Sequence, residues 1–421
     1  MKGELRVGNY KDAELKYAKQ GIDTENALKK LGDKPISINC WQGDDVAGFD
    51  SPENDVVDGL RATGNYPGKA RNFAELTADF DKACELIPGK KRLNLHASYA
   101  VFEPGERVSR DRIEYRHFAP WAGYAKKRGI GLDFNPTCFG HSNVRDGLTL
   151  SSPDQHIQQF WIGHCIQSRR IADAIGRELS DVVLCNVWIP DGFKDIPADR
   201  IGPRLRLKSA LDRIFEQPLE NVVDCVESKL FGVGLESCTV GSLEFYLGYA
   251  SRRKGVYCLL DNGHFHPTET VSDKISSLLC FFDKLPLHIT RPVRWDSDHV
   301  PLFDDETRDI CKEIVRCGAL DKALIGLDFF DASINRIAAW VLGTRSVHKS
   351  LLYALLQPDD KLVELQDAGD FTQKLVRMEE MKTLPFGDVW NEYCARNNVP
   401  YDGEWMSEIV KYEQNVLRKR G

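Results

Sequence analysis

The amino-acid sequence predicts an α/β protein built on a closed (β/α)8 barrel with a C-terminal helical extension, and three observations lead to this fold. Short apolar runs alternate with longer segments of helical period, and there are about eight of the apolar runs. Nearly every apolar run ends in a polar residue that can act in catalysis or binding. A barrel needs eight parallel strands and gathers its functional groups at their carboxyl ends. A doubly wound sheet would concentrate such groups at one switch point, and no glycine-rich nucleotide motif follows the first run.

Each run expected to form a barrel strand is short and mainly aliphatic, as buried parallel strands are. In chain order the runs are Ile36 to Cys40, Arg92 to His96, Gly131 to Phe134, Val182 to Val187, Val222 to Glu227, Val256 to Asp261, Leu287 to Thr290 and Leu324 to Asp328. Between the runs, apolar residues recur at three- and four-residue spacing, which gives each segment a helical face to lay on a barrel. The clearest of these segments are Asp154 to Ile175, Pro203 to Phe215, Ser272 to Phe282 and Glu306 to Cys317.

The two ends of the chain extend beyond what a barrel requires. Residues 1–34 are expected to form an N-terminal helical segment, residues 35–335 the catalytic barrel and residues 336–421 the helical extension. The extension is rich in charge and exceeds a single closing helix, so we expect it to pack on the barrel or on a neighbouring subunit. Its expected helical stretches are Asn335 to Leu356, Lys361 to Lys382, Asp388 to Arg396 and Glu404 to Lys419.

Composition limits the classes of partner. The formal net charge of −7 argues against nucleic acid, which normally needs a basic face, and favours a small soluble metabolite. No apolar stretch has the length of a signal-peptide core or a membrane span. Twelve cysteines are scattered, with no Cys-x-x-Cys pair. That pattern is typical of reduced, buried thiols, so we expect a cytoplasmic protein that does not associate with membranes.

One short stretch carries the strongest chemical signal. Asp261 to Pro267 places a carboxylate and two imidazoles directly after an apolar run, so that Asp261 and His264 could face one divalent ion. A second cluster follows the next run, where Asp296 and Asp298 would lie on one side of an extended segment. Either cluster alone could consist of helix caps and loop carboxylates. Because both follow predicted strands of the same type, together they favour a metal site.

Eight longer motifs give a more specific indication. They are Cys40 to Val46, Ala62 to Arg71, Leu93 to Ala97, Leu132 to Pro136, Val226 to Gly232, Asp261 to Pro267, Thr290 to His299 and Gly326 to Arg336. Together they resemble the L-rhamnose isomerase family, which is similar to xylose isomerase in having a metal-dependent barrel. The resemblance implies an aldose–ketose isomerase that interconverts L-rhamnose and L-rhamnulose, the first step of L-rhamnose degradation, in the cytoplasm and as a homotetramer.

The resemblance also implies two metal centres. Glu227, Asp261, His288 and Asp328 would hold a first, structural ion, expected to be Mn²⁺ or Zn²⁺, and His264, Asp296 and Asp298 a second, catalytic ion, expected to be Mn²⁺. Lys229, His96 and Asp328 are the expected catalytic residues. Lys229 follows a metal ligand by two residues and therefore lies on the same side of an extended segment, where it could donate a hydrogen bond to O1 of the sugar. His96 could bind the ring oxygen and assist ring opening.

The remaining expectations concern the sugar pocket and the reaction. Trp188, His266 and Tyr99 are expected to contact substrate, although strand-end aromatics also belong to plain cores. Gly48 to Gly59 could be a lid over the barrel mouth or an ordinary loop. No glutamate occupies an obvious base position, so a 1,2-hydride shift is favoured over an enediol route. A metal-dependent hydrolase and a noncatalytic sugar-binding or metal-storage protein are the alternatives.

Overall fold

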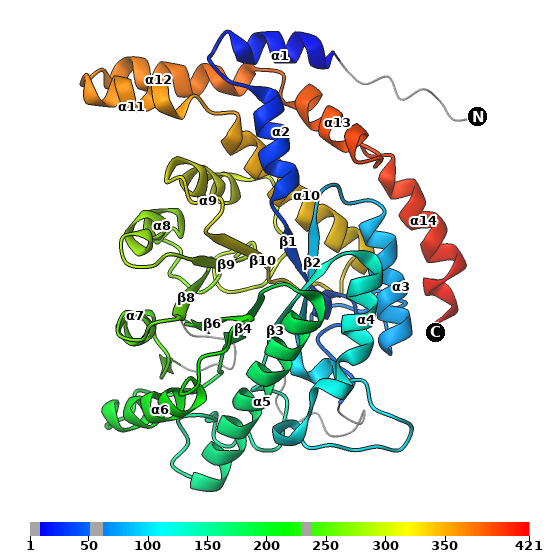
Figure 1. Cartoon of the computed structure of the whole chain (residues 1–421), viewed down its shortest axis with the longest axis vertical. Coiled ribbons are helices and arrows are strands. Elements are labelled where there is room, and N and C mark those ends of the chain that lie inside the picture. Colours follow the sequence, from blue (N-terminus) through cyan, green and yellow to red (C-terminus); the bar gives the residue numbers. More distant parts are fainter. Residues whose placement is uncertain (1–8, 51–61, 230–236, 421) are drawn as a thin grey trace.

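The structure, a computed structural model, describes residues 9–50, 62–229 and 237–420, and its centre is a closed barrel of eight parallel strands (Figure 1). Around the barrel the strands follow the order β1-β10-β9-β8-β6-β4-β3-β2. Their bounds are β1 Ile36–Asn39, β2 Lys91–His96, β3 Gly131–Asn135, β4 Val183–Val187, β6 Val222–Glu227, β8 Val256–Asp261, β9 Leu285–Ile289 and β10 Ala323–Leu327. The predicted (β/α)8 fold is confirmed.

Seven of the eight strands begin within one residue of the predicted position, and the exception has a local cause. β9 starts at Leu285, two residues before the predicted Leu287, and includes Pro286. Proline has no N–H and is uncommon inside strands, so the apolar run reads from the sequence as if it began after it. Pro286 is nevertheless accommodated in the register with Leu324 of β10.

Helices surround the barrel, and side-chain caps fix where several of them begin. α5 begins after Asp154, whose carboxylate accepts from the backbone N–H groups of His156 and Ile157. The helices between the strands are α3 Phe73–Cys84, α4 Ala119–Arg128, α5 Gln155–Leu179, α6 Ile201–Ile214, α7 Leu243–Ala250, α8 Ser272–Leu279 and α9 Asp305–Arg316. A two-stranded antiparallel ribbon of β5 (Gly192–Phe193) and β7 (Cys238–Thr239) lies outside the barrel. In the part of the chain that the structure describes, no helix has the length and apolarity to cross a membrane.

The C-terminal helices join the barrel to the two N-terminal helices, α1 Tyr10–Ala18 and α2 Thr24–Asp33 (Figure 1). α10, Arg336–Leu355, is buried along most of its length and contacts α2, α3, α9 and α13. α13, Phe386–Arg396, lies against α1, and α14, Trp405–Asn415, ends near α3. Through α10, the C-terminal part of the chain is packed against β1 and the helices around it.

One predicted helical stretch is divided in the structure. Lys361 to Lys382 was expected to be helical throughout, but it contains the end of α11, Asp359–Asp367, and all of α12, Phe371–Glu380. Gly369 between them has φ +71°, a left-handed conformation that ends a helix, and Asp370 then caps α12.

Candidate metal centre and active site

Four ligating side chains meet at the carboxyl end of the barrel. Asp261 ends β8, and its Cα pairs in register with that of His288 in the adjacent β9. Glu227 ends β6, and Asp328 follows the last residue of β10. One ligating atom from each of these four residues lies within 4.8 Å of the others, and three of the residues are buried. These are the four residues expected to hold the first ion.

The electrostatics of this cluster favour a cation. Burial, together with the neighbouring carboxylates Asp328 and Glu227, raises the pKa of Asp261 well above its usual range. Burial alone would favour a neutral imidazole at His288, but Glu227, Asp328 and Asp261 raise its pKa to about 9. The protonated His288 therefore supplies positive charge that the carboxylates need. A divalent ion would neutralise the same carboxylates more completely.

Unpartnered polar atoms show that these residues fit a metal ion. Within the described ranges, Asp261 Oδ2, Asp296 Oδ1 and His264 Nδ1 are buried and have no hydrogen-bond partner. A buried polar atom without a partner costs about 1–3 kcal/mol, and more for a charged group. Carboxylate oxygens and imidazole nitrogens are suitable ligands for Mn²⁺, Mg²⁺, Co²⁺ or Zn²⁺. A bound ion would satisfy these atoms.

The residues expected at the second centre adjoin the first cluster. His264 Nε2 lies 3.3 Å from Asp296 Oδ2, and His264 Nδ1 lies 3.5 Å from Glu227 Oε1. Asp298 lines one cavity together with His264 and Asp296 and has φ +46°. Burial and the charge of Asp296 raise the pKa of Asp298 well above its usual range. Among the described residues, the first four ligands form the single group of three or more ligating side chains whose ligating atoms all lie within 4.8 Å of one another. His264, Asp296 and Asp298 do not form such a group by themselves.

A cavity with aromatic walls opens above these carboxylates. The Trp41 ring packs edge-on to His96 at 4.8 Å, His96 packs on Phe139 at 5.4 Å, and Phe139 packs on Trp188 at 5.9 Å. Phe330 also lines the cavity. Such apolar walls exclude water from the space over the carboxylates and strengthen the electrostatic interactions within it.

The two expected catalytic side chains beside the metal ligands both lie in this region. Lys229 is buried, and its Nζ lies 5.8 Å from the centre of the Trp188 ring. Burial lowers the pKa of Lys229 to about 8 against the opposing effect of Asp191 and Asp296. Burial and the charge of His288 lower the pKa of His96 to about 3, so His96 is a neutral imidazole that can donate or accept a hydrogen bond.

Two residues that were expected to contact substrate lie away from the cavity. His266 is exposed, and its Nδ1 lies 2.8 Å from Thr268 Oγ1, so the structure does not bring it to the carboxylates. Tyr99 is 1% exposed and donates to Asp44 Oδ1 at 2.6 Å, which places it in the core and outside the cavity lining. Residues 51–59 of the expected lid lie outside the described residues.

Several cavity residues were missed by the sequence reasoning. Asn186 donates its amide to Glu227 Oε2 and so orients that carboxylate, and its position within an apolar strand was a signal that could have found it. Phe139, Phe330 and Val46 lie in loops after strands, where no sequence spacing marks them. Val46 reaches the cavity from a left-handed backbone conformation, φ +61°.

Fold and site together define a class: a (β/α)8-barrel protein with a candidate divalent-metal centre at the carboxyl ends of its strands. The chain belongs to the L-rhamnose isomerase (RhaA) family, whose model matches residues 5–420. It is an isomerase, as the predicted resemblance implied. The L-rhamnose isomerase of Yersinia pseudotuberculosis serotype O:1b (strain IP 31758) is 54% identical over 410 residues, 97% of each chain. That of Yersinia pestis (strain Pestoides F) has the same identity and coverage.

Solved structures with a similar fold are more distant. A structure of L-ribulose 3-epimerase has a TM-score of 0.47 and 13% identity, covering 70% of this chain and 95% of that one. A structure of D-psicose 3-epimerase in the presence of D-fructose has a TM-score of 0.41 and 13% identity, covering 63% of this chain and 86% of that one.

Proposed function

We propose that this isomerase interconverts L-rhamnose and L-rhamnulose by a metal-assisted 1,2-hydride shift. The supporting observation is the arrangement of the cavity, which is lined by members of the carboxylate–imidazole cluster and by aromatic rings, with Lys229 beside the ring of Trp188. The 54% identity to named L-rhamnose isomerases supports the choice of sugar.

We assign the first ion to Glu227, Asp261, His288 and Asp328, and the second to His264, Asp296 and Asp298. Bound ions would act as Lewis acids that polarise the sugar carbonyl and stabilise negative charge on O1 and O2. The mixture of one imidazole with carboxylates at each centre suits Mn²⁺, which we propose for the catalytic centre, with Mn²⁺ or Zn²⁺ at the first.

The side chains around the ions have separate roles. Neutral His96, which lines the cavity, would hydrogen-bond the ring oxygen and assist opening of the sugar ring. The Lys229 ammonium would donate to O1 and hold the developing charge there. Asp328 would be a metal ligand, and it also lines the cavity. Trp188 would carry the apolar face of the sugar.

The residue inventory favours a hydride shift over an enediol. An enediol route needs a positioned base that removes the hydrogen from C2. Among the described cavity residues, the carboxylates Glu227, Asp296, Asp298 and Asp328 are all assigned to metals, and His96 is a weak base. A hydride shift needs alignment of C1 and C2 and a water-poor cavity, which the aromatic walls provide.

We further propose the biological setting that the family resemblance implies. The reaction would be the first step of L-rhamnose degradation in the cytoplasm, catalysed by a homotetramer. Residues 35–335 would form the catalytic barrel, with residues 1–34 and 336–421 as helical additions that pack on it or on a neighbouring subunit.

A coupled aldose-to-ketose assay tests this proposal. The purified protein is treated with a chelator, and single metals are then added back with L-rhamnose or another aldose as substrate. We expect activity to disappear on chelation, to return with Mn²⁺ and to be highest with L-rhamnose. Full activity in the chelated protein, or no ketose from L-rhamnose with any metal, would contradict the proposal.

A further inference from the structure

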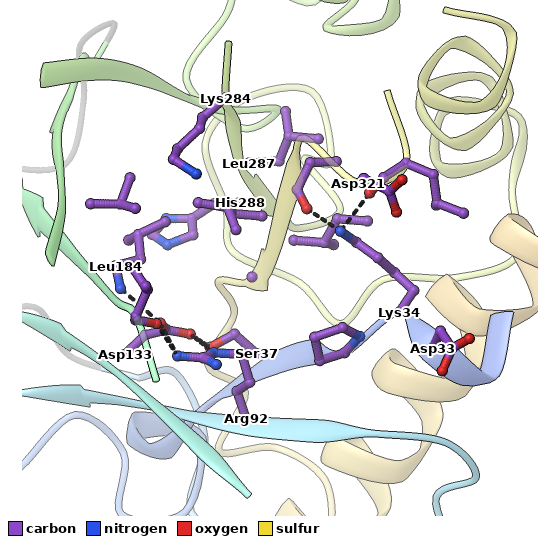
Figure 2. A pocket seen from close by; sticks show the side chains of 18 of the residues that line it. Asp33, Lys34, Ser37, Arg92, Asp133, Leu184, Lys284, Leu287, His288 and Asp321 are labelled. Atoms are coloured by element: carbon purple, nitrogen blue, oxygen red, sulfur yellow. Dashed lines mark hydrogen bonds and ion pairs between the residues drawn. The ribbon is translucent and has the colours of Figure 1, made fainter. Parts of the chain in front are cut away.

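A second cavity lies at the amino-terminal end of the barrel, and Figure 2 shows the side chains that line it. This lower cavity has a volume of about 560 Å³, which is within the range of small-molecule sites. The interior of a (β/α)8 barrel is usually filled by layers of side chains, so an opening of this size is unusual. His288 lines both cavities, and its imidazole is therefore part of the wall between them.

One side of the lower cavity is a closed polar network. Asp133 accepts hydrogen bonds from Arg92 Nε at 2.9 Å and Nη2 at 3.0 Å, from Ser37 Oγ at 2.5 Å and from Leu184 N at 2.9 Å. Four donors fill the four acceptor positions of a carboxylate. Although Asp133 faces the cavity, it therefore has no acceptor capacity left for a ligand or for another donor.

Two residues that line the cavity carry donors outside this network. Figure 2 shows the Lys284 ammonium pointing into the cavity, and it makes no hydrogen bond or ion pair with any residue drawn there. Asn94 is 1% exposed, and its Oδ1 accepts from Asn135 Nδ2 at 2.7 Å. The Asn94 amide N–H₂ group has no hydrogen-bond partner among the residues that the structure describes.

His288 supplies a third donor, although its side chain is only 4% exposed. Its Nδ1 faces the metal ligands, at 3.2 Å from Glu227 Oε1. The opposite edge of the ring lies beside Gly326, where an added Cβ would approach Nε2 to 3.4 Å. Nε2 makes no hydrogen bond within the described ranges. A metal-bound imidazole normally donates its other N–H to a carboxylate, a carbonyl or water, and here that partner must lie in the cavity.

Lys284 and His288 lie on one face of the chain. Lys284 directly precedes β9, His288 lies four residues later, and successive side chains of a strand alternate, so the two point to the same side. Apolar side chains, among them Leu184 and Leu324, line other parts of the cavity. The lower cavity thus offers the Lys284 ammonium, the Asn94 amide, the His288 Nε2–H group and an apolar wall. Asp33, Asp181 and Asp321 also line it, and Asp181 is paired with Arg92.

We propose that the lower cavity binds a small organic anion whose carboxylate accepts hydrogen bonds from Lys284, Asn94 and His288 Nε2–H. Its apolar remainder would rest against Leu184 and Leu324. The inference rests on the proposed function, because Nε2 carries the proton when Nδ1 binds the metal.

Binding of this anion is coupled to the metal through one imidazole. An acceptor on Nε2–H makes Nδ1 a better ligand, and loss of such outer partners typically costs 10- to 100-fold in metal affinity. By linkage, metal and anion strengthen each other's binding by the same factor. The site would thus adjust metal occupancy from the end of the barrel opposite the sugar.

The test measures the affinity of the full chain for Mn²⁺ by competition with a chelating dye, with and without sodium acetate at constant ionic strength. Lys284→Met removes the proposed anchor. Lys30→Met is the matched control, because Lys30 is an exposed lysine at the rim of the same cavity. We expect acetate to tighten Mn²⁺ binding about fivefold or more in the wild type and in Lys30→Met, and by less than about twofold in Lys284→Met.

The possible failures are distinguishable. If Mn²⁺ binds but acetate leaves its affinity unchanged in the wild type, or affects Lys284→Met equally, the anion site is refuted while the metal centre stands. If none of the three proteins binds Mn²⁺, the metal centre itself is refuted, and the inference that rests on it falls as well.

Discussion

Replacement of Asp261 by asparagine should have opposite effects on stability with and without metal. Asp261 Oδ1 accepts from Gly263 N at 2.6 Å, and Oδ2 is buried without a partner among the described residues. An asparagine can keep the first bond and place its amide nitrogen toward Glu227 and Asp328. Because those carboxylates and burial raise the pKa of Asp261, removing its charge should raise the melting temperature of the metal-free protein.

The metal-dependent part of the effect can be estimated. A ligand at a thousand times its dissociation constant stabilises the folded state by about 4.1 kcal/mol. An unfolding entropy of about 2.1 cal/mol/K per residue gives about 0.9 kcal/mol/K for 421 residues. Saturating Mn²⁺ should therefore raise the melting temperature of the wild type by about 4–5 °C. If the substitution weakens binding about a thousandfold, the same Mn²⁺ concentration adds only about 0.4 kcal/mol, less than 1 °C.

Differential scanning calorimetry on chelated and Mn²⁺-loaded protein measures both effects. The matched control is Asp195→Asn, at an exposed aspartate in a surface loop, which should behave as the wild type in both states. A full Mn²⁺-induced shift in Asp261→Asn would show that the ion binds elsewhere. A metal-free variant less stable than the metal-free wild type would refute the argument from carboxylate repulsion.

Four further predictions concern turnover and metal binding. Asp296→Asn should abolish ketose formation while keeping most of the Mn²⁺-induced thermal shift, and near-normal turnover would remove Asp296 from the second centre. Lys229→Met should lower kcat about 100-fold. Because the Lys229 ammonium, with a pKa of about 8, loses its proton as pH rises, wild-type turnover should decline above pH 8. The turnover of the variant should not show that decline. Apparent Mn²⁺ affinity should rise with pH between about 6 and 9, which are the pKa values of Asp328 and His288, because Mn²⁺ must displace their protons. The rise should be up to about tenfold per pH unit, and an affinity that does not change with pH would contradict this. Conversion in deuterium oxide should put little deuterium on carbon, and deuterium at C2 of the aldose should move to C1 of the ketose. Extensive solvent deuterium at C1 of the ketose after one turnover would instead support an enediol route.

The sequence by itself determined the fold and much of the site. Buried parallel strands must be apolar, and the residues that end them must face one end of a barrel, so a linear pattern is enough to locate them. For that reason Glu227, Asp261 and Asp328 could be identified at strand ends without coordinates. In the structure, one ligating atom from each of them and one from His288 all lie within 4.8 Å of one another.

Only the tertiary structure decided which neighbours of those residues belong to the site. His266 lies two residues from His264, yet it is exposed, because the chain turns directly after the strand. Asn186 orients Glu227 from a strand 41 residues away in sequence, a contact that depends on β4 lying beside β6. The lower cavity is likewise formed where the amino-terminal ends of several strands converge. Local spacing specifies which side of a strand a side chain occupies, but barrel closure brings distant segments together, and that closure depends on all eight strands at once.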